Sequence, residues 1–171
     1  IAKHFRVKNH TIIPIANFSQ LAHSALTQNA IDVGDYQAQE GIPNTYVPGR
    51  NTLFLSYAMA WAETIKADAI FIGVSAIDYS GYPDCRPEFI HAFQQLMLSA
   101  TDKDSSIQNC QVIAPLIHMS KQETIEKGLS LGVDYSLTRS CYRLDSEGRA
   151  CGTCDSCVLR KQGFAALGMQ D

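Results

Sequence analysis

The longest helical pattern in the chain spans residues 51–67. Apolar side chains recur at helical spacing at Phe54, Ala58, Trp61 and Ile65, which places them on one face of a helix. Because other apolar residues occupy most of the remaining sides, we expect a central helix that is covered by other elements. The Trp and Met side chains of this segment are expected to belong to the core.

Short continuous apolar runs indicate three strands, at residues 11–16, 69–74 and 111–116. The run at 69–74 is typical of a parallel strand that is covered on both faces, whereas Pro14 suggests an edge strand or an early end at 11–16. Amphipathic patterns predict further helices at residues 18–26, 87–100, 121–131 and 157–167. The alternation of strands and helices predicts a layered α/β fold.

Two polar stretches interrupt this pattern. Residues 27–48 show little periodicity and many turn-forming residues, and a loop of that length in a compact domain is typically functional. Residues 75–86 follow the carboxyl end of a predicted buried strand, where ligands bind in open α/β sheets. A turn-rich connection in which Asp84 caps the next helix is the structural alternative.

Ser120 and Glu123 form the sequence pattern of a capping box at the start of a helix. Lys121 then lies in the first turn, where a cation opposes the helix dipole. A nearby phosphate or carboxylate would resolve that conflict. The alternative is an exposed lysine that turns toward water.

Four cysteines close to the end of the chain follow the spacing C-x9-C-x2-C-x2-C, at Cys141, Cys151, Cys154 and Cys157. The two C-x2-C steps and the returning loop let all four thiolates reach one tetrahedral Zn²⁺, with no open coordination position. Such a closed site is structural, and iron–sulfur ligation is the chemical alternative. Cys110 lies in an apolar run and is expected to be a small core residue.

The overall composition is that of one ordinary domain of 171 residues. The formal net charge of −3 gives no reason to expect nucleic acid as a partner. The sequence shows no apolar run of membrane-spanning length and no signal-peptide layout, so we expect a cytoplasmic protein in which clustered cysteines bind metal.

Three blocks carry a resemblance to a known family, at residues 42–51, 73–89 and 140–160. In this order they closely resemble the 7-cyano-7-deazaguanine synthases of queuosine biosynthesis. The resemblance covers the chain from about residue 40 to the C-terminus. It implies a Rossmann-like, layered parallel sheet of the adenine nucleotide alpha hydrolase-like (PP-loop) superfamily. We therefore expect residues 1–171 to be a single α/β domain, with a C-terminal zinc-binding loop at 138–160 on the four cysteines.

The resemblance also implies a reaction. ATP, with Mg²⁺, adenylates the carboxylate of 7-carboxy-7-deazaguanine, ammonia converts it to the amide, and a further ATP-driven activation and dehydration gives the nitrile. Charge neutralisation at the phosphates suits Arg50 and Lys121. Residue types suggest further candidates for the substrate. Asp78 or Asp84 could accept hydrogen bonds from the base edge, and Tyr79 or Tyr82 could stack on the ring. Arg86 could pair with the substrate carboxylate.

One departure from the family pattern concerns the phosphate-binding loop. The superfamily's Ser-Gly-Gly-x-Asp-Ser sequence does not occur in these residues, and the chain begins at Ile1 without an initiator methionine. We therefore expect an N-terminally incomplete sequence that has no synthase activity alone. Two alternatives are a PP-loop enzyme that adenylates or thiolates a tRNA base and a non-catalytic zinc-stabilised interaction domain. The family resemblance further suggests a homodimer.

Overall fold

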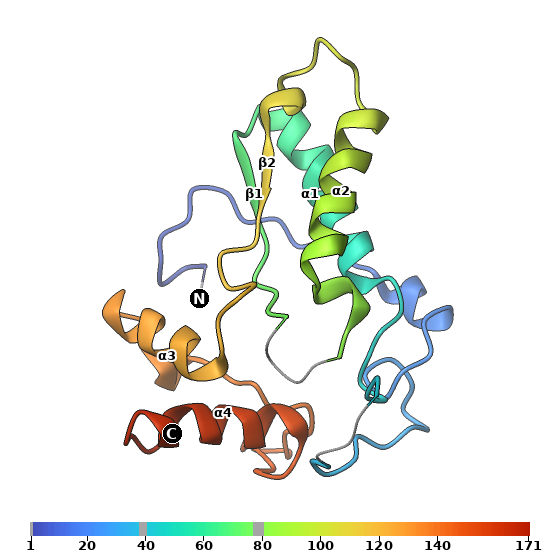
Figure 1. Cartoon of the computed structure of the whole chain (residues 1–171). Helices are drawn as coiled ribbons and strands as arrows, with labels where there is room; N and C mark the ends of the chain where they lie inside the picture. The colour runs from blue at the N-terminus through green and yellow to red at the C-terminus, as the bar shows by residue number, and fades with distance from the viewer. Residues whose placement is uncertain (1, 38–40, 77–80) are drawn as a thin grey trace.

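A parallel two-stranded sheet and two long helices form the upper part of the molecule (Figure 1). The computed structural model describes residues 2–37, 41–76 and 81–171. Its α-helices are α1 (Arg50–Ile65), α2 (Pro87–Ala100), α3 (Lys121–Ser130) and α4 (Asp155–Ala166). Its strands are β1 (Ala69–Phe71) and β2 (Gln111–Ile113), which pair in parallel with Ile70 opposite Val112.

The sequence predicted these elements well along the second half of the chain and poorly at its start. Helix α2 has the predicted bounds, and α1, α3 and α4 lie within two residues of theirs at each end. The predicted strand at 11–16 and helix at 18–26 are wrong, because that region holds only a 3-10 turn at Ala16–Gln20. Ile12 is 82% exposed, so the apolar run has no core to face. The fold is therefore α/β with a small sheet, and its two strands each end after three residues.

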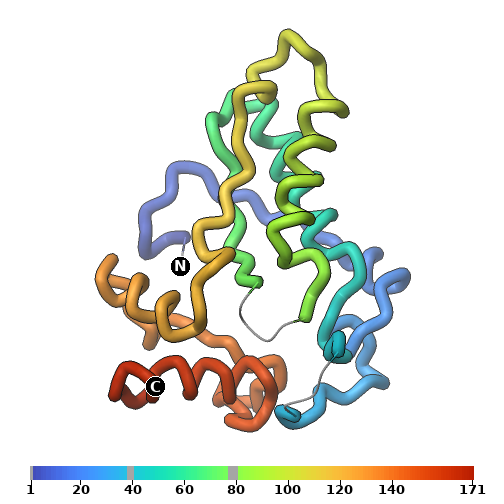
Figure 2. Tube along the Cα trace, viewed as in Figure 1, coloured from blue at the N-terminus to red at the C-terminus, as the bar shows by residue number. Residues whose placement is uncertain are grey.

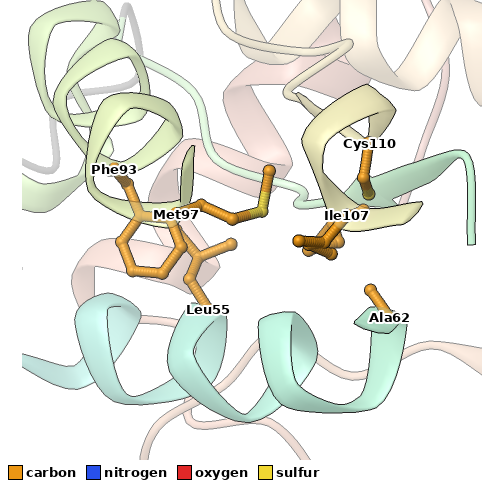
Figure 3. Close-up of a cluster of buried hydrophobic side chains, with 7 residues drawn as sticks. Leu55, Ala62, Phe93, Met97, Ile107 and Cys110 are labelled. Carbon is orange, nitrogen blue, oxygen red and sulfur yellow. The ribbon is translucent and has the colours of Figure 1, made fainter. Parts of the chain in front are cut away.

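The main hydrophobic core lies where α1 and α2 pack against the strands (Figure 3). Leu55 and Ala62 from α1 meet Phe93 and Met97 from α2 around Ile107. Cys110 and Ile70 complete the cluster, so the prediction that Cys110 is a core residue is confirmed. Helix α2 connects the two parallel strands, as a crossover connection must.

The face of α1 that packs inward differs from the predicted one. Leu55 and Ala62 are buried, whereas Phe54, Trp61 and Ile65 are 46%, 48% and 50% exposed. The prediction that α1 is covered on most sides, with Trp61 in the core, is therefore wrong. An apolar segment with no clear polar stripe does not reveal which stripe meets the core.

The sheet is likewise covered on one face rather than both. Ile70 points into the core, whereas Phe71 is 69% exposed. Side chains alternate between the two faces of a strand, so these neighbours report opposite faces. Within the described residues, the face that carries Phe71 has no covering helix.

The start of α1 is tied to the loop before α2. Asp84 accepts a hydrogen bond from the backbone N–H of Asn51 through Oδ2 at 3.1 Å, and the Asn51 amide donates to the Asp84 carbonyl at 3.0 Å. The expectation that Asp84 caps α2 is wrong, because the residue preceding α2 is Arg86 and its side chain makes no cap bond. Asp84 instead satisfies a helix-start donor of α1.

Helices α3 and α4 form a second packing unit, side by side in the lower part of Figures 1 and 2. The predicted capping box is confirmed at the start of α3, where Ser120 accepts from the N–H of Glu123 and Glu123 accepts from the N–H of Ser120. Gly132 follows α3 with a φ of 75°, a conformation that favours glycine. The two helices approach closely at Gly163 of α4.

Gly163→Ala is expected to lower the free energy of unfolding by about 1 kcal/mol. The added Cβ would lie 2.7 Å from both Ile125 Cδ1 and Lys121 Cγ, and overpacking costs about 1–3 kcal/mol. The better helix propensity of alanine offsets only about 0.5–1 kcal/mol of this cost. Urea unfolding measures the difference. Gly34→Ala, with open space around its Cβ, serves as the control. Equal stability of the Gly163 variant and the wild type would contradict this close packing.

Candidate metal centre and adjoining cavities

The four cysteines of the C-x9-C-x2-C-x2-C pattern come together in the structure. Their Sγ atoms all lie within 4.8 Å of one another, and all four are free thiols. Cys154 directly precedes α4 and Cys157 lies in its first turn, and both are buried. Cys141 and Cys151 come from the preceding loop and are half-buried. The helix start and the loop thus supply two ligands each.

This geometry fits a tetrahedral tetrathiolate ion. With metal–sulfur bonds of zinc length, two ligand sulfurs are separated by about 3.8 Å. The Sγ atoms of Cys141 and Cys154 are 4.0 Å apart. A bound zinc ion would hold the loop and the start of α4 together, and four soft thiolates are the donor set that zinc accepts.

Backbone N–H groups point at the sulfurs of the loop. Cys141 Sγ accepts from the N–H of Arg143 at 3.2 Å and of Cys151 at 3.3 Å. Cys151 Sγ accepts from the N–H of Thr153 at 3.5 Å and of Cys154 at 3.3 Å. Such donors favour the thiolate form and orient it.

The pKa values of the cysteines differ with their surroundings. Burial acts to raise the pKa of Cys151, but hydrogen bonds from Thr153, Cys154 and neighbouring side chains outweigh it and lower the pKa to about 5. Burial raises the pKa of Cys157 to about 12. A bound cation would favour the thiolate form of Cys157, which burial opposes.

An outer layer of polar side chains ties the cysteine loop to the N-terminal part of the chain. Thr153 donates to Asp35 at 2.7 Å, and Arg143 pairs with Asp35 and donates to Thr153 at 2.7 Å. The hydrogen bonds from Thr153 and Arg143 lower the pKa of Asp35. Val33 packs against Cys154 and Cys157. Sequence reasoning missed Asp35 and Arg143, because Asp35 lies more than 100 residues from both Arg143 and Thr153.

A cavity of ≈ 360 Å³ lies beside this centre, between α3, α4 and the loops that face them. Its lining combines aromatic rings with charged groups and includes Tyr82, Lys121, Arg139, Tyr142, Asp155 and Arg160. This volume suits a small bicyclic ligand, and a few polar groups on an apolar wall are typical of ligand sites.

Arg160 is held in place on one side of this cavity. Its guanidinium lies 5.7 Å from the ring centroid of Tyr135 and 5.4 Å from that of Phe164. It also pairs with Asp171 at 2.7 Å and donates to Thr138 at 2.6 Å. These contacts fix its position before any ligand arrives, and they make it part of the wall.

A second cavity, of ≈ 470 Å³, opens at the carboxyl end of β1. It is lined by Arg50, Gly73, Ser75 and Tyr82, among others. The guanidinium of Arg50 lies 5.7 Å from the centroid of the Tyr82 ring, and the Tyr82 hydroxyl shares a 2.7 Å hydrogen bond with Thr45. Tyr82 lines both cavities, so the two share this residue as part of their walls.

The structure distributes the predicted substrate residues over several places. Arg50 lines the cavity at the strand end, Lys121 lines the one between α3 and α4, and Tyr82 lines both. Asp84 and Arg86 are not among the described residues that line either cavity: Asp84 is buried beside Asn51 and Arg86 is exposed. Asp78 and Tyr79 lie outside the described residues.

The fold and the site define an α/β protein in which four clustered cysteines could hold a metal ion, with two ligand-sized cavities nearby. Of the helices in residues 2–37, 41–76 and 81–171, none has both the length and the apolar character needed to cross a bilayer. Comparison with known proteins then identifies the family.

The family model described as "Queuosine biosynthesis protein QueC" matches residues 1–168. Over all 171 residues, the chain is 56% identical to a 7-cyano-7-deazaguanine synthase of Coxiella burnetii (strain RSA 331), of which it covers 75%. It is 52% and 51% identical, with the same coverage, to synthases of that name from Pseudomonas putida (strain W619) and Pseudomonas fluorescens (strain SBW25). The chain belongs to the QueC family of queuosine biosynthesis enzymes, as the three sequence blocks predicted.

Proposed function

We propose that this protein is an ATP-dependent carbon–nitrogen ligase that converts 7-carboxy-7-deazaguanine and ammonia to 7-cyano-7-deazaguanine. One observation carries the proposal beyond the family name: two cavities share Tyr82, one at a strand end and one beside the cysteine centre. Adenylation needs two ligands held close to each other, and cavities that share a wall residue are neighbours.

The nucleotide is assigned to the cavity at the carboxyl end of β1. This is the place where open α/β sheets bind their ligands. Arg50 lines it, so its guanidinium suits phosphate oxygens. Mg²⁺ accompanies the ATP, since bridging phosphate oxygens is the usual role of that ion.

The carboxylated base is assigned to the cavity between α3 and α4. The rings of Tyr82 and Tyr142 line it and suit a flat bicycle, and Lys121 supplies a cation for the substrate carboxylate. The carboxylate attacks the α-phosphorus of ATP with loss of pyrophosphate, and ammonia displaces AMP to give the amide. A second adenylation on the amide oxygen, followed by loss of AMP and a proton, gives the nitrile.

Zinc is proposed as a structural ion, one per chain, on Cys141, Cys151, Cys154 and Cys157. When bound, it would supply a rigid junction between the loop and α4, and a closed tetrathiolate site leaves no position for substrate. The side chains that line the adjoining cavity, Tyr142 and Asp155, directly follow two of these cysteines. The metal would therefore set the position of a cavity wall.

Four further assignments carry over from the sequence, two of them, the sheet type and the dimer, from the family resemblance. We propose a Rossmann-like sheet, a single domain over residues 1–171 with the zinc loop at 138–160, a cytoplasmic location and a homodimer. Sedimentation at micromolar concentration tests the dimer, and a monomer at all concentrations would contradict it. The alternative of a non-catalytic domain loses support, because the relatives are named as synthases.

A chimera is expected to show the activity. It would place the segment of the Coxiella burnetii relative that carries the family's phosphate loop before Ile1. With ATP, ammonia and 7-carboxy-7-deazaguanine, we expect the nitrile, pyrophosphate and AMP, measured by mass spectrometry. The 171-residue polypeptide alone is expected to bind the base and form no product, because its sequence holds no Gly-rich phosphate loop.

Lys121→Ala in the chimera is expected to lower kcat/KM about 100-fold, the usual effect of losing one charge-stabilising group. Lys127→Ala, on the exposed side of the same helix, is the matched control.

Product formation by the 171-residue polypeptide would overturn its proposed inactivity. Salt-dependent binding of tRNA, without binding of the free base, would favour the tRNA-modifying alternative.

A further inference from the structure

Asp155 is an acidic side chain in the wall of the cavity between α3 and α4. It is the first residue of α4 and is half-buried. Two other carboxylates of the described residues have protein partners: Asp171 pairs with Arg160, and Asp84 accepts from Asn51 through one of its oxygens. Across the described parts of the chain, Asp155 has neither a hydrogen-bond donor nor an ion-pair partner. A half-buried carboxylate in a cavity wall is suited to accept hydrogen bonds from a ligand.

The charges of this cavity select a particular kind of ligand. Besides Asp155, it is lined by the cations Lys121, Arg139 and Arg160. Arg160 is engaged by Asp171 and Thr138 rather than by Asp155. A complementary ligand carries hydrogen-bond donors on one edge and an anionic group on another. A guanine-type base with a carboxylate on its five-membered ring has this distribution, with N1–H and the 2-amino group at the edge opposite the carboxylate.

We propose that Asp155 is the specificity-determining residue for the base, accepting hydrogen bonds from its N1–H and 2-amino groups. This inference rests on the proposed function and names a residue that would recognise the substrate of that reaction. It replaces the sequence-based expectation for Asp84, whose Oδ2 already binds α1 and which is not among the described residues lining either cavity. The two carboxylate oxygens match two parallel donors, the geometry of a bidentate contact.

The structural alternative is that Asp155 only stabilises the start of α4, since a carboxylate in the first turn favours the helix dipole. The two roles are distinguished by ligand preference. In Asp155→Asn, the amide oxygen still accepts from N1–H, but its NH₂ group opposes the 2-amino group of the base. The same NH₂ group can donate to the oxygen of a xanthine-type base, which carries a 2-oxo group. If Asp155 binds the base, Asp155→Asn should change the preference from the guanine-type to the xanthine-type base. Loss of a stabilising charge at the start of α4 would not change that preference.

The test measures binding of two probes to the zinc-loaded 171-residue polypeptide by calorimetry. The probes are 7-carboxy-7-deazaguanine and its 2-oxo analogue. Wild type is expected to prefer the guanine-type probe. Asp155→Asn is expected to bind that probe about tenfold or more weakly, the usual discrimination of a bidentate contact. It is also expected to prefer the 2-oxo probe. Asp104→Asn, an exposed site outside both cavities, is the matched control and should behave as wild type.

Asp155→Ser is measured in parallel, because serine is also favourable at a helix start and lacks the carboxylate. It is expected to lose the guanine-type preference without gaining the 2-oxo one, at unchanged zinc content. Equal weakening of both probes, or no weakening, in the Asp155 variants would overturn the assignment and leave the proposed function standing. Failure of wild type to bind either probe would overturn both.

Discussion

Cys154→Ser is expected to reduce bound zinc from about one ion per chain to nearly none. The free energy of unfolding should fall by about 3–5 kcal/mol, because the binding energy of a structural metal is folding energy. Cys154 is fully buried, its Sγ lies in the four-sulfur cluster, and it immediately precedes α4. Its loss would free the start of that helix from the preceding loop. Elemental analysis and urea unfolding measure the two effects.

The same variant should loosen the N-terminal region that packs on the cysteines. Val33 belongs to their cluster, and Tyr36 donates its N–H to the carbonyl of Thr153 at 2.7 Å. Limited proteolysis should therefore cut near residues 27–37 faster than in wild type. Cys110→Ser is the matched control, because it places the same hydroxyl in a buried site away from the cluster. It should lose stability but keep its zinc. Full zinc content in the Cys154 variant would contradict the four-cysteine site.

Met97→Ala is expected to lower the free energy of unfolding by about 2–5 kcal/mol, the range for truncating a buried methionine. Met97 is 0% exposed and packs among Leu55, Phe93 and Ile107 in the core that Figure 3 shows. The cavity left behind is bordered by α1, which limits relaxation. Zinc content should stay unchanged, since the cysteines belong to a different cluster. Urea unfolding with elemental analysis checks both statements.

Met169→Ala makes the same chemical change at a side chain that is 42% exposed. Its effect should stay within about 0.5 kcal/mol. A Met97→Ala variant with nearly the wild-type free energy of unfolding would contradict the packing of α1 against α2. Loss of zinc on Met97→Ala would instead indicate that the two cores unfold as one cooperative unit.

The sequence determined the features that depend on neighbours along the chain. Helices α2, α3 and α4 were predicted because their periodic apolar positions and the Ser120–Glu123 capping box are local signals. The cysteine cluster was predicted because two C-x2-C steps bring sulfurs together within a few residues. The three family blocks are local as well, and they identified the family.

Only the tertiary structure decided which surfaces meet. Trp61 was expected in the core and is half exposed, because an apolar helix can pack through any of its stripes. Arg143 meets Asp35 across 108 positions, and Tyr82 lines two cavities whose walls come from distant segments. Nothing in the sequence pointed to Asp155 as a ligand-binding residue. Its candidacy depends on the cavity between α3 and α4, which it lines. Local spacing fixes helices and metal ligands, whereas the shape and charge of a cavity depend on long-range packing.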